Sequence, residues 1–224
     1  MMMYIILWII IFVILLYVLY RYKCNQIIVD TQKGSMKGPH VIFITAVHGN
    51  EKGPHYAVKR YMTEHSIKKG KLTHIIVNIC GLLTHNRENG ILNIDINRNF
   101  DNINYINREI LDIVKTGDYI VDFHESLKSS YNSKYIGNVI FYNKQYVDSM
   151  NMVSILNNKF DDENWIVSNQ SKNRFNFVNG TLLEYCYEKD IPYLLIETSR
   201  NNALNVRVKQ TDEILNYIYD KYLQ

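Results

Sequence analysis

The chain has 224 residues, of which 47% are hydrophobic, and its formal net charge is +3. This length is enough for one domain with a sizeable core, and the small charge, spread along the sequence, excludes the clustered basic surface of a nucleic-acid-binding protein. The three cysteines, Cys24, Cys80 and Cys186, are odd in number and have no Cys-x-x-Cys spacing. They argue against a disulfide framework and a thiolate zinc site, and they favour a reducing compartment.

The N-terminal segment differs in composition from the rest of the chain. Residues 1–20 contain no charged side chain, and a helix needs about 20 apolar residues to cross a bilayer. A cleaved signal peptide normally has a charged start, a shorter apolar stretch and a small-residue cleavage site, none of which is visible here. We therefore predict one transmembrane anchor over 1–22, a linker over 23–39 and one globular domain over 40–224. A buried core helix is the alternative, but such a helix normally lies inside the fold.

The charges beside the anchor predict its orientation. Arg21 and Lys23 follow the apolar span and no charged residue precedes it, so the positive-inside bias places the domain in the cytosol. Asn169 and Asn179 begin Asn-x-Ser/Thr sequences, which would matter as glycosylation sites only in the opposite orientation.

Beyond the anchor, short apolar runs alternate with longer amphipathic stretches. The runs expected to form strands are 41–47, 74–80, 119–123, 138–142, 165–168 and 193–197. The stretches expected to form helices are 54–65, 104–116, 145–159, 181–189 and 211–222. Pro54 suits the first turn of its helix, where its missing N–H would be unpaired anyway. Strands alternating with helices predict an α/β fold with a mostly parallel sheet and helices on both faces.

Polar side chains collect at the carboxyl ends of four expected strands. They are His48 and Glu51, Arg87 with the stretch 95–100, His124, and Glu197. In open α/β sheets, ligands bind outside the carboxyl ends of the strands. Each residue alone is typical of an ordinary surface position, but together they indicate a functional site at one rim of the sheet.

Three of these residues suit a metal ion. His48, Glu51 and His124 form a set of two histidines and one carboxylate, which leaves a four-coordinate zinc ion with an open position for water. Gly49 gives the loop between the first two residues conformational freedom. We therefore predict one catalytic Zn²⁺ rather than a structural one.

Four motifs occur in an order that resembles a known family. They are HGNEKG at 48–53, DINRNF at 95–100, DFHES at 122–126 and LLIETS at 194–199. Together they resemble the M14 zinc carboxypeptidase clan, and HGNE with a glycine two residues later is closest to its succinylglutamate desuccinylase/aspartoacylase branch. The resemblance covers about residues 40–200. It implies a three-layer α/β fold with a mostly parallel mixed sheet.

The resemblance also implies roles for the residues at the rim. His48, Glu51 and His124 would hold the zinc ion, and Glu197 would be the general base that takes a proton from water and passes it to the leaving amine. Zinc lowers the pKa of its bound water to about 7, so a nearby carboxylate can complete the nucleophile. Arg87 stands where the family keeps the arginine that stabilises the oxyanion, although a solvent-exposed loop arginine is an equal alternative.

The motif DINRNF resembles the substrate-binding part of the family site. Asn97 and Arg98 match the pair that holds the substrate's free carboxylate, a task that suits the planar fork of arginine. Asp95 stands where the family places a carboxylate that orients the first histidine ligand, with an ordinary turn aspartate as the alternative. Arg108 and Arg200 are competing carboxylate partners, but a surface role is simpler for both.

One departure from the family leaves the substrate open. Digestive carboxypeptidases carry a tyrosine shortly before a Gly-Ser or Gly-Thr pair, whereas this chain has Phe175 and Phe177 there and no tyrosine until Tyr185. Tyr131 and Tyr135, which follow the His124 motif, are possible substitutes.

We predict a membrane-anchored zinc hydrolase that cleaves an amide bond next to a free carboxylate. Its partners would be a small peptide or an N-acyl amino acid, and the membrane through the N-terminal helix, but not nucleic acid. Two alternatives stay open: a broader zinc amidase acting on cell-wall-type peptides, and a catalytically inactive carboxylate-binding domain on a membrane tether. The complete set of ligands, base and carboxylate-binding residues argues against the inactive domain.

Overall fold

A computed structural model describes most of the chain. The described residues are 2–24, 26–89, 94–101, 105–126, 137–160, 164–169 and 180–224. Phe175 and Phe177, which stand where the family has a tyrosine, and the two suggested substitutes, Tyr131 and Tyr135, lie outside these ranges, whereas Tyr185 lies within them.

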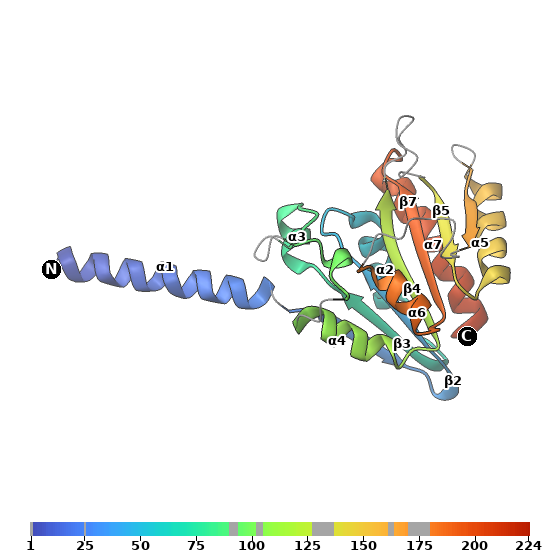
Figure 1. The fold of residues 1–224 in the computed structure, drawn as a ribbon, viewed down its shortest axis with the longest axis horizontal. Helices are drawn as coiled ribbons and strands as arrows, with labels where there is room; N and C mark the ends of the chain where they lie inside the picture. The colour runs from blue at the N-terminus through green and yellow to red at the C-terminus, as the bar shows by residue number, and fades with distance from the viewer. Residues whose placement is uncertain are drawn as a thin grey trace.

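Seven strands form one sheet in the order β1-β3-β2-β4-β7-β5-β6 (Figure 1). The strands are β1 (Ile28–Lys33), β2 (Met36–Thr45), β3 (Lys69–Ile76), β4 (Tyr119–Ser126), β5 (Val139–Tyr142), β6 (Ile166–Asn169) and β7 (Tyr193–Ser199). The central strands β3, β2, β4 and β7 run parallel, whereas β1 and β5 pair antiparallel with their inner neighbours. The prediction of a mostly parallel mixed sheet is confirmed.

Helices cover both faces of this sheet. The helical elements are α1 (Met2–Cys24), α2 (Lys52–Glu64), α3 (Ile79–Thr84), the 3-10 turn η1 (Ile96–Arg98), α4 (Tyr105–Val114), α5 (Tyr146–Lys159), α6 (Leu182–Glu188) and α7 (Leu204–Tyr222). One buried cluster, with Val41 and Phe43, joins α2, α5 and α7 to one face. A second, with Ile42 and Ile44, joins α4 and α6 to the other. Alternation along β2 therefore builds the three layers.

The predicted strands and helices are present, with shifts at their ends. The apolar run 74–80 does not continue as a strand, because β3 ends at Ile76 and α3 begins at Ile79. The side-chain oxygen of Asn78 accepts a hydrogen bond from the backbone N–H of Gly81 at 2.8 Å, which caps the first turn of α3. This turn redirects the chain toward the rim of the sheet.

Strand β1 was not predicted. It lies within 23–39, the stretch expected to be a linker, and pairs along its length with β3. Its side chains are mostly exposed at the edge of the sheet, so its sequence lacks the apolar alternation that marks a half-buried strand. The stretch 23–39 therefore contains an edge strand and the start of β2, while the outer limits of anchor and domain stay predictions.

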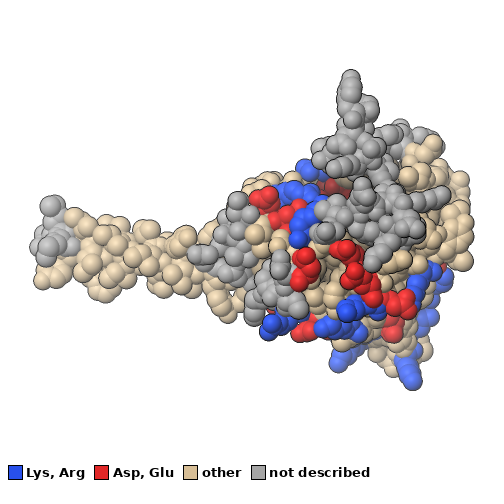
Figure 2. Space-filling view, in the orientation of Figure 1, with Lys and Arg blue, Asp and Glu red and all other residues tan. Residues whose placement is uncertain are grey.

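Helix α1 extends away from the domain (Figure 1). Among the described residues it is the one helix long and apolar enough to cross a membrane, and none of its apolar window is buried. In Figure 2 the described part of its apolar stretch shows no charged side chain, whereas charged side chains of both signs are mixed over the domain. The alternative of a buried core helix is therefore wrong, and α1 is a candidate membrane span.

The cysteine prediction is corrected by the structure. Cys24, the last residue of α1, forms a disulfide with Cys80 of α3, with Cα atoms 5.1 Å apart, and Cys186 is the buried free cysteine. The side-chain amide of Asn89 also donates a hydrogen bond to the Cys24 carbonyl at 3.1 Å. Sequence alone does not reveal such a pair, because its members are 56 residues apart and connectivity depends on the fold.

Candidate metal centre

The predicted site residues meet where three neighbouring parallel strands end. In the register of the sheet, His124 of β4 lies opposite Glu197 of β7. On the other side of β4, β2 pairs through Thr45, and His48 follows it by three residues. Because parallel strands end at the same edge, residues from distant parts of the sequence gather there.

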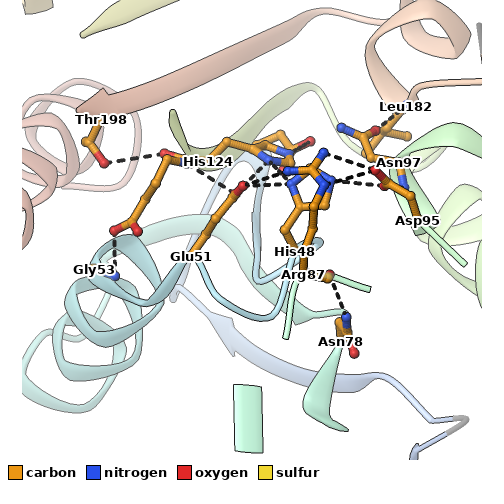
Figure 3. A network of polar contacts seen from close by, with 12 residues as sticks. His48, Glu51, Gly53, Asn78, Arg87, Asp95, Asn97, His124, Leu182 and Thr198 are labelled. Atoms are coloured by element: carbon orange, nitrogen blue, oxygen red, sulfur yellow. Dashed lines mark hydrogen bonds and ion pairs between the residues drawn. The ribbon is translucent and has the colours of Figure 1, made fainter. Parts of the chain in front are cut away.

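His48, Glu51 and His124 form a compact, buried group that could hold a metal ion. Glu51 lies between the rings (Figure 3): its two oxygens are 2.7 Å from His48 Nδ1 and 2.9 Å from His124 Nδ1. The two Nδ1 atoms are 3.2 Å apart. Both imidazoles thus turn the same nitrogen toward one point, and the carboxylate faces that point, as ligands of one ion would.

Two further carboxylates hold the opposite nitrogens of these rings. His48 Nε2 lies 3.0 Å from an oxygen of Asp95, and His124 Nε2 lies 3.2 Å from an oxygen of Asp122. The Tyr193 hydroxyl donates to the same Asp122 oxygen at 2.6 Å. A carboxylate on Nε2 fixes the tautomer that leaves Nδ1 free for a metal.

The sequence analysis did not predict a role for Asp122, although its spacing from His124 could have indicated one. It stands two residues before His124 on β4, and residues two apart on a strand face the same side of the sheet. Asp122 is fully buried, so its charge needs the partners that His124 and Tyr193 provide.

Arg87 belongs to the site rather than to open solvent. Its Nε and Nη2 donate to one oxygen of Asp95 at 3.2 and 3.0 Å, and its Nη1 lies 3.7 Å from Glu51. The side chain is 41% exposed, so it stands at the rim, where part of it faces solvent. This position allows a contact with a bound substrate.

The loop around His48 depends on two glycines that approach closely. A Cβ on Gly49 would lie 2.1 Å from the backbone of Gly81 in α3. The Gly49 N–H and the side-chain amide of Asn78 both donate to the Arg87 carbonyl, each at 3.2 Å. Gly49 is therefore needed for close packing of the loop against α3, not for the loop freedom that the sequence suggested.

Asn97 and Arg98 lie in η1, beside the metal group. The N–H of Asn97 donates to Asp95 at 3.0 Å, and its side-chain oxygen accepts from the N–H of Leu182 at 3.1 Å. The Arg98 guanidinium donates to the Asn97 carbonyl at 2.7 Å. Burial lowers the pKa of Arg98, while the nearby carboxylates, including Glu197, oppose this change. Asn97 thus links Asp95 to the start of α6, and Arg98 lies beside it.

Glu197 is a carboxylate without a hydrogen-bonding partner at one oxygen. Its Oε2 is buried and has no such partner among the described residues. Burial raises the pKa of Glu197 to about 7 in the protein alone, and a divalent cation nearby would lower it. A carboxyl group with a pKa in this range can both accept and return a proton near neutral pH.

The competing arginines lie elsewhere. Arg108 is exposed on α4, and Arg200 is half-buried in the turn after β7, where its N–H donates to the Ser126 carbonyl at 2.7 Å. Neither has a recorded contact with His48, Glu51 or His124.

Sequence comparison identifies no relative: no family model and no curated protein matches the chain. Solved structures do match. The tripeptide-bound cell shape determinant Csd4 from Helicobacter pylori aligns with a TM-score of 0.76 and 16% identity, over 88% of this chain and 55% of that chain. The present chain has the zinc carboxypeptidase fold. It spans about half of the length of Csd4.

Two other matching structures show that enzymes of different kinds share the zinc carboxypeptidase fold. A candidate metallopeptidase from Shewanella amazonensis SB2B has a TM-score of 0.63 and 14% identity, over 87% of this chain and 82% of that one. A succinylglutamate desuccinylase/aspartoacylase from Rhodobacter sphaeroides has a TM-score of 0.60 and 16% identity, over 88% and 58%. Peptidases and desuccinylases thus share the architecture.

The charge state of the two histidines predicts proton release on metal binding. Burial alone would lower the pKa of His48 and of His124, but the carboxylates of Glu51, Asp95 and Asp122 outweigh it, so both pKa values are raised. A raised pKa shifts each imidazole toward its protonated form, and zinc must displace the protons that remain bound. We expect up to about two protons released per zinc at pH 7, and tighter binding as pH rises.

Calorimetric titration of zinc into the chelator-treated protein, in buffers of different ionisation enthalpy, would count these protons. Zinc uptake with no proton release would contradict the electrostatics described above.

Proposed function

We propose that this protein is a zinc-dependent hydrolase that cleaves an amide bond next to a free carboxylate. The observation that carries the proposal is the juxtaposition of His48, Glu51 and His124 with Glu197 on the neighbouring strand, whose buried Oε2 has no hydrogen-bonding partner among the described residues. A metal site built only for stability is closed by four protein ligands, whereas a catalytic site keeps an open position. Here the three ligands and the adjacent base leave that position open.

Each polar group at the rim has a role in this reaction. A zinc ion, when bound, supplies a Lewis acid and a water of lowered pKa. Glu197 takes a proton from the attacking water and returns it to the leaving amine. Arg87 stabilises the negative charge that develops on the carbonyl oxygen, while Asn97 and Arg98 hold the free carboxylate of the substrate.

The substrate class follows from the carboxylate-binding pair and the fold. A small peptide and an N-acyl amino acid both present an amide next to a free carboxylate. A cell-wall-type peptide is the second candidate. The mDAP-bound structure of Csd4, described as a D,L-carboxypeptidase, matches this chain with a TM-score of 0.74, against 0.60 for the desuccinylase/aspartoacylase. An inactive carboxylate-binding domain would have no need for Glu197.

Substitutions of the base, Glu197, and of the carboxylate clamp, the pair Asn97 and Arg98, are expected to affect catalysis in different ways. Glu197→Gln keeps the size of the side chain and leaves the metal ligands intact, but it removes the proton acceptor. We expect zinc to stay bound while kcat falls by about 10²-fold or more. Metal analysis and steady-state kinetics on the same sample would check this. Full activity in Glu197→Gln would remove the general base from the mechanism.

Arg98→Ala removes the clamp and leaves water activation unchanged. For substrates with a free carboxylate, kcat/KM is expected to fall on the order of 10²-fold, whereas amidated forms should be poor substrates for both proteins. The measurement is a panel of blocked dipeptides and N-acyl amino acids, each with and without the free carboxylate. Equal wild-type turnover of free and amidated forms would favour the broader amidase.

We also propose that α1 anchors the protein in a membrane, with the domain on the non-cytosolic side. The charges of Arg21 and Lys23 favour the cytosol, but two charges set only a bias. The Cys24–Cys80 disulfide joins the end of α1 to the domain, and disulfides persist mainly in oxidising compartments. A disulfide depends on the redox state of the compartment and is the stronger indication of location than two flanking charges.

Protease protection would test this orientation. In sealed vesicles carrying the full chain, the domain is expected to be protected until detergent is added, and the protein should resist carbonate extraction. Thiol labelling of the denatured, unreduced chain is expected to modify Cys186 alone. Digestion of the domain in intact vesicles would restore the cytosolic orientation, and carbonate release would exclude a membrane-spanning α1.

A further inference from the structure

Glu125 lies next to His124 but on the other side of the sheet. Successive side chains of a strand point to opposite faces, so His124 faces α4 and α6 while Glu125 faces α2 and α7. The Glu125 side chain is fully buried, at 0% exposure, and it cannot touch a substrate. A buried carboxylate at this point needs partners, and those partners connect it to the metal group.

Both the backbone and the side chain of Glu125 bind the first turn of α2. Its backbone N–H donates to Glu51 Oε2 at 3.1 Å, and its side-chain Oε1 accepts from the Gly53 N–H at 2.8 Å. Its other oxygen pairs with the guanidinium of Arg207 on α7. One residue of β4 thus joins the strand that carries His124 to the helix start that carries Glu51.

Among the residues that the structure describes, no other side chain caps the start of α2. Glu51 occupies the N-cap position but makes no capping hydrogen bond, because its carboxylate is turned to the two histidines. The first N–H groups of a helix need acceptors, and a negative charge is favourable there. Glu125, from a distant part of the chain, supplies the acceptor and the negative charge that a local capping side chain would otherwise provide.

Gly53 is the residue that makes this approach possible. A Cβ at position 53 would lie 2.5 Å from Glu125 Oε1 and 3.1 Å from Arg207 Cβ. A larger residue would displace the Glu125 carboxylate from the first turn of α2. The glycine two residues after Glu51, part of the motif HGNEKG, therefore has a physical reason in the Glu125 contact.

We propose that Glu125 is a positioning residue that sets the place of Glu51 relative to His124 and thereby the geometry of the metal site. The proposal rests on the proposed function, since it assumes that these residues bind zinc. Without the Glu125 carboxylate, the first turn of α2 loses its acceptor and Arg207 loses its partner. Glu51 then keeps only the backbone contact to β4.

The test uses the full chain in detergent, with zinc affinity measured by competition with a chelator and ligand geometry by the visible spectrum of the Co²⁺ form. Glu125→Ala is expected to weaken zinc binding about 10- to 100-fold and to change the Co²⁺ spectrum. Glu125→Gln keeps an acceptor for the Gly53 N–H, so its loss should be smaller. Gly53→Ala should reproduce the defect from the opposite side of the contact.

Asp148→Asn is the matched control. Asp148 is also a buried carboxylate paired with a cation, Lys221, and it accepts hydrogen bonds from Tyr119, Tyr217 and Tyr222. It lies at the opposite end of β4, where Tyr119 begins the strand. Its substitution is expected to lower stability while zinc affinity and the Co²⁺ spectrum stay unchanged.

The outcomes separate this proposal from the proposed function. Wild-type zinc affinity and an unchanged Co²⁺ spectrum in both Glu125→Ala and Gly53→Ala would overturn the positioning role and leave the hydrolase intact. A wild type that binds zinc but cleaves nothing in the substrate panel would overturn the hydrolase, while weakened binding in the variants would still support positioning. A wild type that takes up no zinc would overturn both. If Glu125→Ala does not fold, Glu125→Gln and Gly53→Ala decide the question.

Discussion

Two buried imidazoles, those of His48 and His124, have Nδ1 atoms 3.2 Å apart, and this proximity requires negative charge around them. Like charges at such a distance repel strongly in a poorly solvated interior. Glu51 lies between the rings, and Asp95 and Asp122 lie behind them. The carboxylates offset the repulsion between the two rings when they carry protons, and they equally suit neutral histidines around a divalent cation.

The sheet explains how this group is assembled. His48 and His124 are 76 residues apart in the chain, but the strands that lead to them are hydrogen-bonded neighbours. Glu197 comes from the next strand along. Because all three strands are parallel and central, their carboxyl ends are adjacent and are held on both sides by the core. This positions ligands more firmly than loops alone could.

Proteins that share this fold differ in the side chains at the rim of the sheet. The structures that match this chain include a D,L-carboxypeptidase and a desuccinylase/aspartoacylase, all at 16% identity or less. One architecture therefore serves different substrates, so the side chains at the rim, rather than the sheet, must distinguish them. The disulfide between Cys24 and Cys80 adds a constraint from outside the sheet, since α3 supports the loop that follows His48 through Gly81.

The amino-acid sequence by itself determined the apolar strands, the order of the motifs and the residue types at the rim, because apolar periodicity and metal-ligand chemistry are local properties. Only the tertiary structure decided that Asp122 stands behind His124, which cysteines pair, and that the polar stretch before β2 forms an edge strand. Asp122 and Glu125 show the reason. Their roles depend on partners such as Tyr193 and Arg207, which lie 71 and about 80 residues away along the chain and meet them only when strands and helices pack.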